Sequence, residues 1–157
     1  MNKNIKKIEI MVEKEKGCED LPLPKAASQY ASGIDLFSAE EDIIEVKPGE
    51  RKLVSTGIKI ALPLGFEAQV RPRSGLAYRY GITVLNTPGT IDSDYRGIIK
   101  IILIHHGKES FFIKRGDRIA QLVIQKVFQP ILVETNELDN TKRGKGGFGH
   151  TGIETNY

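Results

Sequence analysis

The sequence predicts an all-β protein that folds as a sandwich or barrel around a single core. Apolar and polar residues alternate through several short stretches of the 157-residue chain, as they do in half-buried strands. Turn signals rich in Gly and Pro separate these stretches at intervals of about ten residues, the spacing of strands in a sandwich or barrel. The length is that of one domain, large enough to bury about two-thirds of the surface of its unfolded chain.

Alternation predicts the first strand from Lys7 onward, with one face that should pack inward: Ile8, Ile10 and Val12. The same alternation returns in three later sets: Val54, Thr56, Ile58 and Ile60; Phe66, Ala68 and Val70; and Ile119, Gln121, Val123, Gln125 and Val127. Turn signals separate the strands at Pro48-Gly49, Pro63 to Gly65, Thr87 to Gly89, His106-Gly107 and Arg115 to Asp117.

Two other stretches carry apolar side chains at successive positions and are rich in β-branched residues: Ile98 to Ile104 and Ile119 to Phe128. This pattern indicates strands that are buried on both faces. In a small sandwich, we expect another subunit to cover the second face.

Only Ser74 to Tyr80 has the signals of a helix. Ser74 can cap its first turn, and Gly81 can adopt the left-handed conformation that ends a helix. The sequence therefore predicts one helix of at most about two turns.

The composition changes after Val133, so we expect a β domain over residues 1–133 and a flexible C-terminal arm over 134–157 that is no separate domain. The arm is polar as far as Lys145 and carries glycines at 144, 146, 147, 149 and 152 around Phe148. Such an end is often merely disordered. The embedded Arg143 and the aromatic ring argue against a pure spacer.

Charge and composition exclude several classes of protein. The 23 basic and 20 acidic residues leave a net charge of +3 with no run of five or six like charges, so stable nucleic-acid binding is not expected. The longest apolar cluster, Ile98 to Ile104, is interrupted by Lys100 and is far shorter than the roughly 18 residues of a membrane span. A single cysteine, Cys18, forms no internal disulfide, and glutamates break the apolar stretch that a signal peptide needs. We expect a cytoplasmic protein.

Five short segments hold the residues that could carry chemistry: Ala31 to Leu36, Arg71 to Ala77, Gly89 to Gly97, Gly116 to Gln121 and Arg143 to Gly152. In the second segment, Arg73, Ser74 and Gly75 offer a guanidinium, a hydroxyl and helix N–H groups, all donors suited to phosphate oxygens. A capped surface helix beside an arginine is the plainer interpretation.

Carboxylates in the third and first segments suit hydrolysis. Asp92 and Asp94 lie in an expected turn, where aspartate is common for backbone reasons alone. A carboxylate near a phosphate seat can also act as general base for a water, and Asp35 can hold a hydrated magnesium ion.

Other familiar sites are excluded by their spacing. Lys145 is followed by glycine instead of Ser or Thr, so the glycine-rich arm is not a Walker loop. His105 and His106 point to opposite faces of an expected strand and cannot readily share a metal. The chain has no Gly-x-Ser-x-Gly elbow for a serine hydrolase.

In this order and spacing, the five segments resemble the five motifs of the homotrimeric dUTP pyrophosphatase (dUTPase) family, over nearly the whole chain. The resemblance implies a jelly-roll or distorted β-barrel subunit of the β-clip type. It also implies a homotrimer whose active sites are shared between chains, with the arm of one subunit closing a site.

The resemblance further implies Mg²⁺-dependent hydrolysis of dUTP to dUMP and pyrophosphate, which keeps uracil out of DNA and supplies dUMP for thymidylate synthesis. Asp92 matches the general base, and Asp35 matches the carboxylate that holds the metal through water. The phosphate-binding residues that match are Arg73, Ser74, Gly75, Gln121 and Arg143.

The Asn86–Tyr95 hairpin matches the segment that selects uracil by its edge and excludes the methyl group of thymine. Tyr95 matches the ring that packs against deoxyribose and excludes a 2′-hydroxyl. The residues implied at uracil and deoxyribose are Asn86, Thr90, Ile91, Asp92, Tyr95, Lys100 and Phe148. Two positions depart from the family pattern: Ser32 replaces an alanine, and His150 replaces a serine.

Three alternatives stay open. A dCTP deaminase, or a bifunctional deaminase and dUTPase, resembles this fold, although its extra catalytic glutamate is not evident here. A non-catalytic nucleotide-sensing trimer would keep the site without needing a positioned base. A single-stranded nucleic-acid module would need several aromatic residues on one basic strand face, and the aromatic residues here are scattered.

Overall fold

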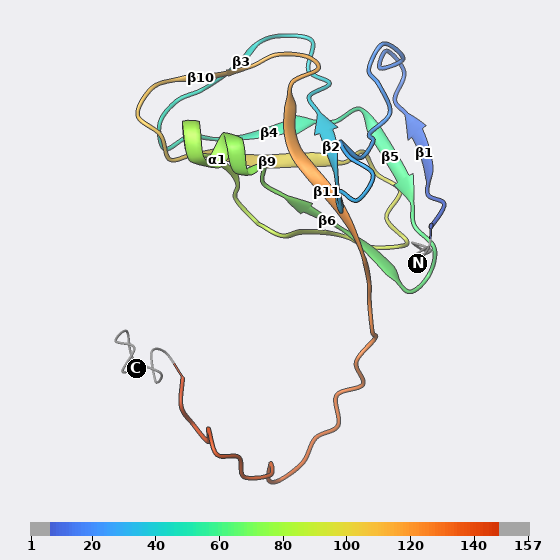
Figure 1. The fold of residues 1–157 in the computed structure, drawn as a ribbon, viewed down its shortest axis with the longest axis vertical. Coiled ribbons are helices and arrows are strands. Elements are labelled where there is room, and N and C mark those ends of the chain that lie inside the picture. Colours follow the sequence, from blue (N-terminus) through green and yellow to red (C-terminus); the bar gives the residue numbers. More distant parts are fainter. Residues whose placement is uncertain (1–6, 148–157) are drawn as a thin grey trace.

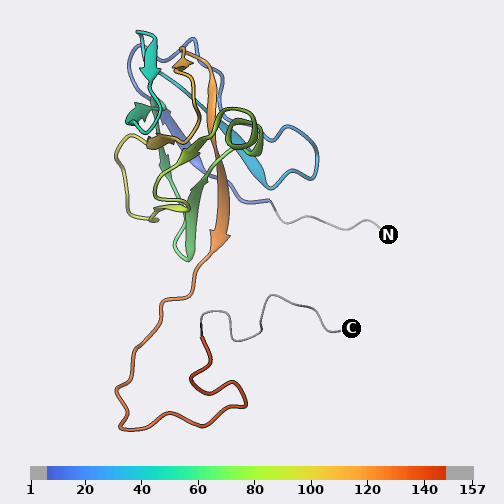
Figure 2. The same ribbon diagram turned by 90° about the vertical axis from the view of Figure 1, so that its left-hand side faces the viewer.

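The computed structural model describes residues 7–147, which form eleven strands and one helix (Figures 1 and 2). The elements in chain order are β1 (Met11–Lys14), β2 (Gly33–Phe37), β3 (Ile44–Val46), β4 (Arg51–Ser55), β5 (Ile58–Ala61), β6 (Phe66–Arg71), α1 (Ser74–Tyr80), β7 (Ile82–Val84), β8 (Gly89–Ile91), β9 (Lys100–His105), β10 (Phe111–Ile113) and β11 (Arg118–Lys126). The prediction of an all-β class with one short helix is confirmed.

The strands form four antiparallel sheets within the described residues. The largest has the order β2-β11-β6-β8, and a three-stranded sheet has the order β4-β9-β7. Two-stranded ribbons, β1-β5 and β10-β3, flank them. Because neighbours in the large sheet are distant in sequence, residues of β2, β6 and β11 come together on one surface.

One apolar cluster fills the interior and draws on both of the larger sheets. The four-stranded sheet contributes Leu36, Ala68, Val70, Ile91 and Leu122, and the three-stranded sheet contributes Val54, Ile82, Val84, Ile101 and Leu103, all less than a tenth exposed. The opposite face of the four-stranded sheet is left free for polar residues.

Most predicted strand faces are confirmed, and the ends of two strands differ. The alternating set from Val54 to Ile60 is buried throughout. The first strand begins at Met11, and Val12 is 39% exposed, because β1 has only β5 as a neighbour. The last strand ends at Lys126, and Phe128 beyond it is exposed.

Helix α1 has the predicted bounds, but Ser74 does not cap it. The capping position is taken by Arg73, no side chain bonds there, and Ser74 is the first helical residue. Gly81 ends the helix as predicted, with φ of 68° and its N–H donated to Ala77 O. An ideal Cβ on Gly81 would lie 2.5 Å from the backbone nitrogen of Gly107, so this crossing also requires glycine.

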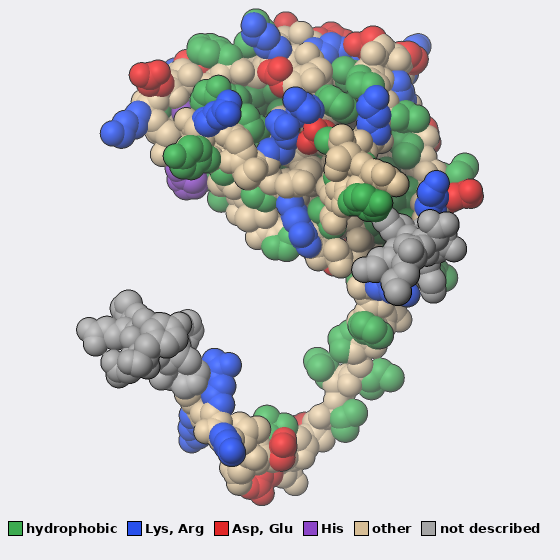
Figure 3. Space-filling view, viewed as in Figure 1, with side chains coloured by type: hydrophobic (Ala, Val, Ile, Leu, Met, Phe, Trp, Pro, Cys, Tyr) green, Lys and Arg blue, Asp and Glu red, His purple; other side chains and the backbone are tan. Residues whose placement is uncertain are grey.

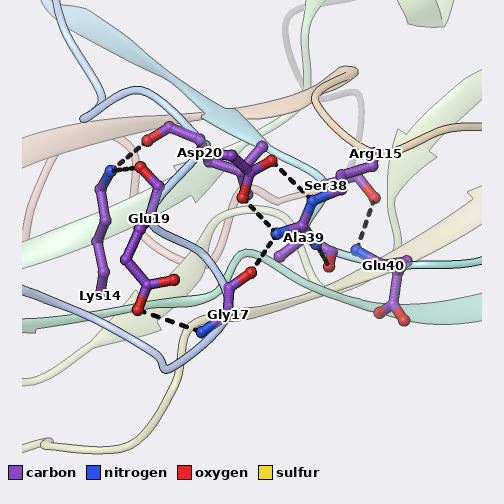
Figure 4. Close-up of polar contacts among 9 residues, drawn as sticks. Lys14, Gly17, Glu19, Asp20, Ser38, Ala39, Glu40 and Arg115 are labelled. Atoms are coloured by element: carbon purple, nitrogen blue, oxygen red, sulfur yellow. Dashed lines mark hydrogen bonds and ion pairs between the residues drawn. The ribbon is translucent and has the colours of Figure 1, made fainter.

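Arg115 fastens the loop after β1 to the turn between β10 and β11 (Figure 4). Its guanidinium donates to both carboxylate oxygens of Asp20 at 3.0 and 2.7 Å, to Gly17 O at 2.6 Å and to Ala39 O. The guanidinium holds the pKa of Asp20 below its ordinary value, and the carboxylate raises the pKa of Arg115. Cys18 is buried beside this network.

Residues 127–147 form no helix or strand and run away from the folded body in both ribbon views (Figures 1 and 2). Figure 3 shows apolar side chains projecting along the segment that leaves β11. Four of them are at least 81% exposed: Phe128, Ile131, Leu132 and Val133. No helix among the described residues is long and apolar enough to cross a membrane.

Candidate active site

The segment after β8 carries Asp92 to the edge of a cavity of about 160 Å³, which we call the Asp92 cavity. Thr90 and Asp92 are exposed, whereas Ile91 between them is buried, as strand alternation requires. Within residues 7–147, no cation pairs with the Asp92 carboxylate. The cavity is lined by Val70, Val84, Asn86, Gly89, Thr90, Ile91, Asp92, Tyr95, Ile99, Lys100, Ile101 and Ile102.

Six predicted base and sugar residues therefore meet at one cavity: Asn86, Thr90, Ile91, Asp92, Tyr95 and Lys100. The Tyr95 ring folds back over its own loop, where its hydroxyl donates to Ile98 O at 3.0 Å. Asn86 lies against Gly89, whose ideal Cβ would be 3.2 Å from the amide nitrogen. The cavity thus combines apolar strand residues with a few polar groups, as small-ligand sites do.

A second hollow of about 450 Å³, which we call the arginine hollow, lies where β2, β11 and the start of α1 meet. It is lined by Ala27, Ala31, Ser32, Gly33, Asp35, Arg73, Ser74, Gly75, Arg118 and Gln121. Four of the five predicted phosphate-binding residues and the predicted metal carboxylate come together here. The fifth, Arg143, is exposed in the arm and donates to Gly146 O at 2.9 Å. Phe148 and His150 lie outside the described residues.

Asp35 is held between two arginines in this hollow. Its Oδ1 accepts from Arg73 Nε at 2.9 Å, and its Oδ2 accepts from Arg118 Nη1 at 3.2 Å. The Asp35 side chain is 19% exposed, so the pairs are partly shielded from solvent. Two guanidinium groups against one carboxylate leave the hollow with an excess positive charge, which suits an anion of several charges.

The donor set fits magnesium held through water better than direct coordination. Both oxygens of Asp35 already face guanidinium groups. In the part of the chain that the structure describes, no cluster of three His, Cys, Asp or Glu side chains is placed to hold a metal. A magnesium ion here would therefore take most of its ligands from a bound polyphosphate and from water.

Gln121 bridges the hollow and the loop before α1, because its Nε2 donates to Pro72 O at 2.9 Å. Its Oε1 lies over Gly33, where an ideal Cβ would approach to 2.1 Å. A side chain at Gly33 would therefore displace this amide. Asp35 and Gln121 are paired across β2 and β11, so their side chains stand on the same polar face of the sheet.

The two hollows share no residue and stand far apart on one chain. Asp35 pairs with Gln121, which in turn pairs with Arg71 on β6. Ile91, next to Asp92, pairs with Ala68, which lies three residues from Arg71 along β6. Strands β2 and β8 are also the two edges of this sheet. In a regular sheet these offsets place the backbones of Asp35 and Ile91 roughly 18 Å apart.

Arg118 is the site residue that the sequence reasoning missed. It lies inside the fourth segment, one residue before the alternating set that begins at Ile119, and no role was predicted for it. The pairing of β11 with β2 shifts register between Arg118 and Ala120, so Arg118 pairs with Phe37 and turns outward toward Asp35. Its place in the same segment as the predicted phosphate-binding residue Gln121 was the available signal.

The fold and the two hollows define an all-β protein with two polar hollows at opposite edges of one sheet, one with an excess of positive charge and the other with an exposed carboxylate. The chain belongs to the dUTPase family, because the model of that family matches residues 19–152. The resemblance of the five segments is thereby confirmed.

Curated relatives match the sequence of this chain over almost its whole length. The chain is 56% identical over 144 residues to the deoxyuridine 5'-triphosphate nucleotidohydrolase of Thermoanaerobacter sp. (strain X514), covering 92% of this chain and 97% of that protein. It is 57% identical over 136 residues to the protein of the same name from Neorickettsia sennetsu, covering 87% and 91%.

Solved structures confirm the fold. A variant of the Staphylococcus bacteriophage 80alpha dUTPase with dUpNHpp superposes with a TM-score of 0.81 at 24% identity, covering 92% of this chain and 99% of that one. A variant dUTPase from phage phi11 of S. aureus, described with a structural Mg(II) ion, gives 0.75 at 21% identity, covering 85% and 100%. The expected β-clip or jelly-roll architecture is therefore confirmed.

Proposed function

We propose that the protein hydrolyses dUTP to dUMP and pyrophosphate at sites shared between three identical chains. One observation carries the sharing: sheet geometry places the backbones of Asp35, in the arginine hollow, and Ile91, in the Asp92 cavity, roughly 18 Å apart on one chain. A triphosphate held by Arg73 would be too far from a water held by Asp92 of the same chain. The arginine hollow of one copy must meet the cavity of a neighbour.

Asp92 is the proposed general base. Its exposed carboxylate takes a proton from the water that attacks the α-phosphorus of dUTP in line, and pyrophosphate leaves. Arg73, Ser74, Gly75 and Gln121 line the hollow that would bind the phosphates and stabilise the charge that develops on them. This route needs a base at the end of β8 and donors at the start of α1.

Magnesium is the proposed cofactor, and when bound it would neutralise charge on the triphosphate. Asp35 would hold its water ligands, while Arg73 and Arg118 keep that carboxylate in place. The Arg73 guanidinium would thus bind both the Asp35 carboxylate and a phosphate of the substrate. The net positive charge of the hollow remains available to the substrate.

The cavity beside β8 would select the nucleoside. Asn86 and the backbone of its hairpin would pair with the uracil edge, and Tyr95 would pack against the deoxyribose. Thr90, Ile91 and Lys100 line the same cavity. A cavity of about 160 Å³ fits a pyrimidine and leaves little room for additional groups.

The exposed apolar segment after β11 supports a trimer with exchanged arms. Phe128, Ile131, Leu132 and Val133 are almost fully exposed on a segment that forms no strand, and such apolar surface is typical of a site of contact with a partner. Contact with a neighbour would cover it and carry residues 134–157 toward a site. There Arg143 would meet the terminal phosphate and Phe148 would stack on uracil.

Pyrophosphate release from dUTP, dTTP, dCTP and UTP, each with magnesium, tests this proposal. We expect turnover of dUTP and little of the other three. Formation of dUTP or dUMP from dCTP would instead show a deaminase. Tight binding of dUTP without turnover would show the nucleotide-sensing trimer. We further propose a cytoplasmic location, which suits a chain with one cysteine.

A further inference from the structure

Gly97 lies directly against the ring of Tyr95 in the loop that follows β8. A methyl group built on Gly97 would stand 2.3 Å from the Tyr95 hydroxyl oxygen, 2.5 Å from Cζ and 3.0 Å from Cε2. These distances are well inside van der Waals contact, so any side chain at this position must displace the ring. The backbone of Gly97 has no positive φ and would accept another residue. Glycine is present here to make space for the ring.

The rest of the loop holds the ring on this glycine. The Tyr95 hydroxyl donates to Ile98 O at 3.0 Å, and the Tyr95 N–H donates to Asp92 O at 3.2 Å. Arg96 closes the turn by donating from Nη1 to Ser93 O at 2.7 Å and to Tyr95 O at 2.9 Å. These hydrogen bonds place the Tyr95 ring against Gly97.

The ring separates Gly97 from the cavity, since Tyr95 lines the cavity and Gly97 does not. We propose that Gly97 is a specificity-determining residue, whose bare α-carbon sets how far the Tyr95 ring reaches into the sugar end of the cavity. The proposal rests on the proposed function, in which this ring packs against deoxyribose. A methyl group at Gly97 would break the bond to Ile98, lift the ring off the loop and narrow the space for the sugar.

The substitution Gly97→Ala tests this directly. We expect KM for dUTP to rise at least about tenfold, with kcat within about threefold of wild type, because binding of the sugar is impaired and Asp92 is untouched. Ser93→Ala is the matched control, since it shortens a side chain in the same loop whose hydroxyl makes no hydrogen bond among the described residues. It should leave both constants unchanged.

A double-mutant cycle with Tyr95→Ala separates an effect on the ring from an effect on the loop. Once the ring is removed, adding Gly97→Ala should change KM by less than about twofold, because the added methyl has nothing to displace. A wild-type KM in Gly97→Ala would overturn the inference, as would a loss that persists in the Tyr95→Ala background. If Tyr95→Ala itself keeps the KM and the dUTP to UTP preference of wild type, the proposed sugar contact fails, and the inference fails with it.

Discussion

At the scale of single residues, Asp92 is the proposed general base. It is exposed at the cavity, with no cation paired to it among the described residues. Asp92→Asn keeps the shape and removes the proton acceptor, so we expect kcat to fall at least about a hundredfold while the Kd for a non-hydrolysable dUTP analogue changes little. Asp94→Asn is the control and should matter much less. Near-normal turnover in Asp92→Asn would refute the assignment.

Gly33 tests the placement of Gln121 at the same scale. An alanine at Gly33 would stand 2.1 Å from Gln121 Oε1, so the flexible amide must move away and release Pro72 O. We expect Gly33→Ala to raise KM for dUTP about tenfold, because the displaced Gln121 amide would lose its proposed hydrogen bond to a charged phosphate of the substrate. Gln121→Ala should match it, and the double variant should be no worse than either. Additive losses would show that Gly33 acts through other contacts.

At the scale of elements, the Arg115 network joins the loop after β1 to the β10–β11 turn. Because Arg115 lowers the pKa of Asp20, this pair stabilises the fold at pH values above the ordinary pKa of an unfolded aspartate. The stabilisation disappears as the pH falls through the lowered pKa of Asp20 in the folded protein. We therefore expect Asp20→Asn to have a lower Tm than wild type at pH 7, and the gap in Tm to close at an acidic pH below the lowered pKa of Asp20.

Arg115→Lys is the companion variant for this network. A lysine provides one point charge where the guanidinium reaches Asp20, Gly17 O and Ala39 O together, so it should also lower the Tm at pH 7. An equal gap between Asp20→Asn and wild type at both pH values would show that the carboxylate charge contributes nothing.

At the scale of the whole molecule, the proposed sharing of each site between chains predicts complementation between inactive variants. Asp92→Asn damages the cavity of a chain, and Arg73→Ala damages its arginine hollow. Trimers refolded from a 1:1 mixture should regain roughly a quarter of wild-type activity, because each site draws its two halves independently. Each variant refolded alone is the control, and light scattering checks for a trimer. A mixture as inactive as its components would mean that each site lies within one chain.

Much of the fold and of the site could be predicted because the signals are local. Alternation located the strand cores, and the Ser74–Tyr80 helix was bounded correctly by Gly81. Most of the predicted phosphate-binding residues lie together in the arginine hollow, and most of the predicted uracil and deoxyribose residues lie together in the Asp92 cavity. The capping of α1 was predicted wrongly because the choice between Arg73 and Ser74 as the capping position depends on backbone angles, and the chemistry of the side chains does not reveal them.

The sequence by itself determined the class of fold, the inner and outer faces of the central strands and the family, since each follows from residue type and spacing along the chain. Only the tertiary structure decided that Arg118 faces Asp35, because a shift of register in β11 reverses the alternation there. It alone placed the arginine hollow and the Asp92 cavity at opposite edges of one sheet, because strand order depends on packing between segments distant in sequence.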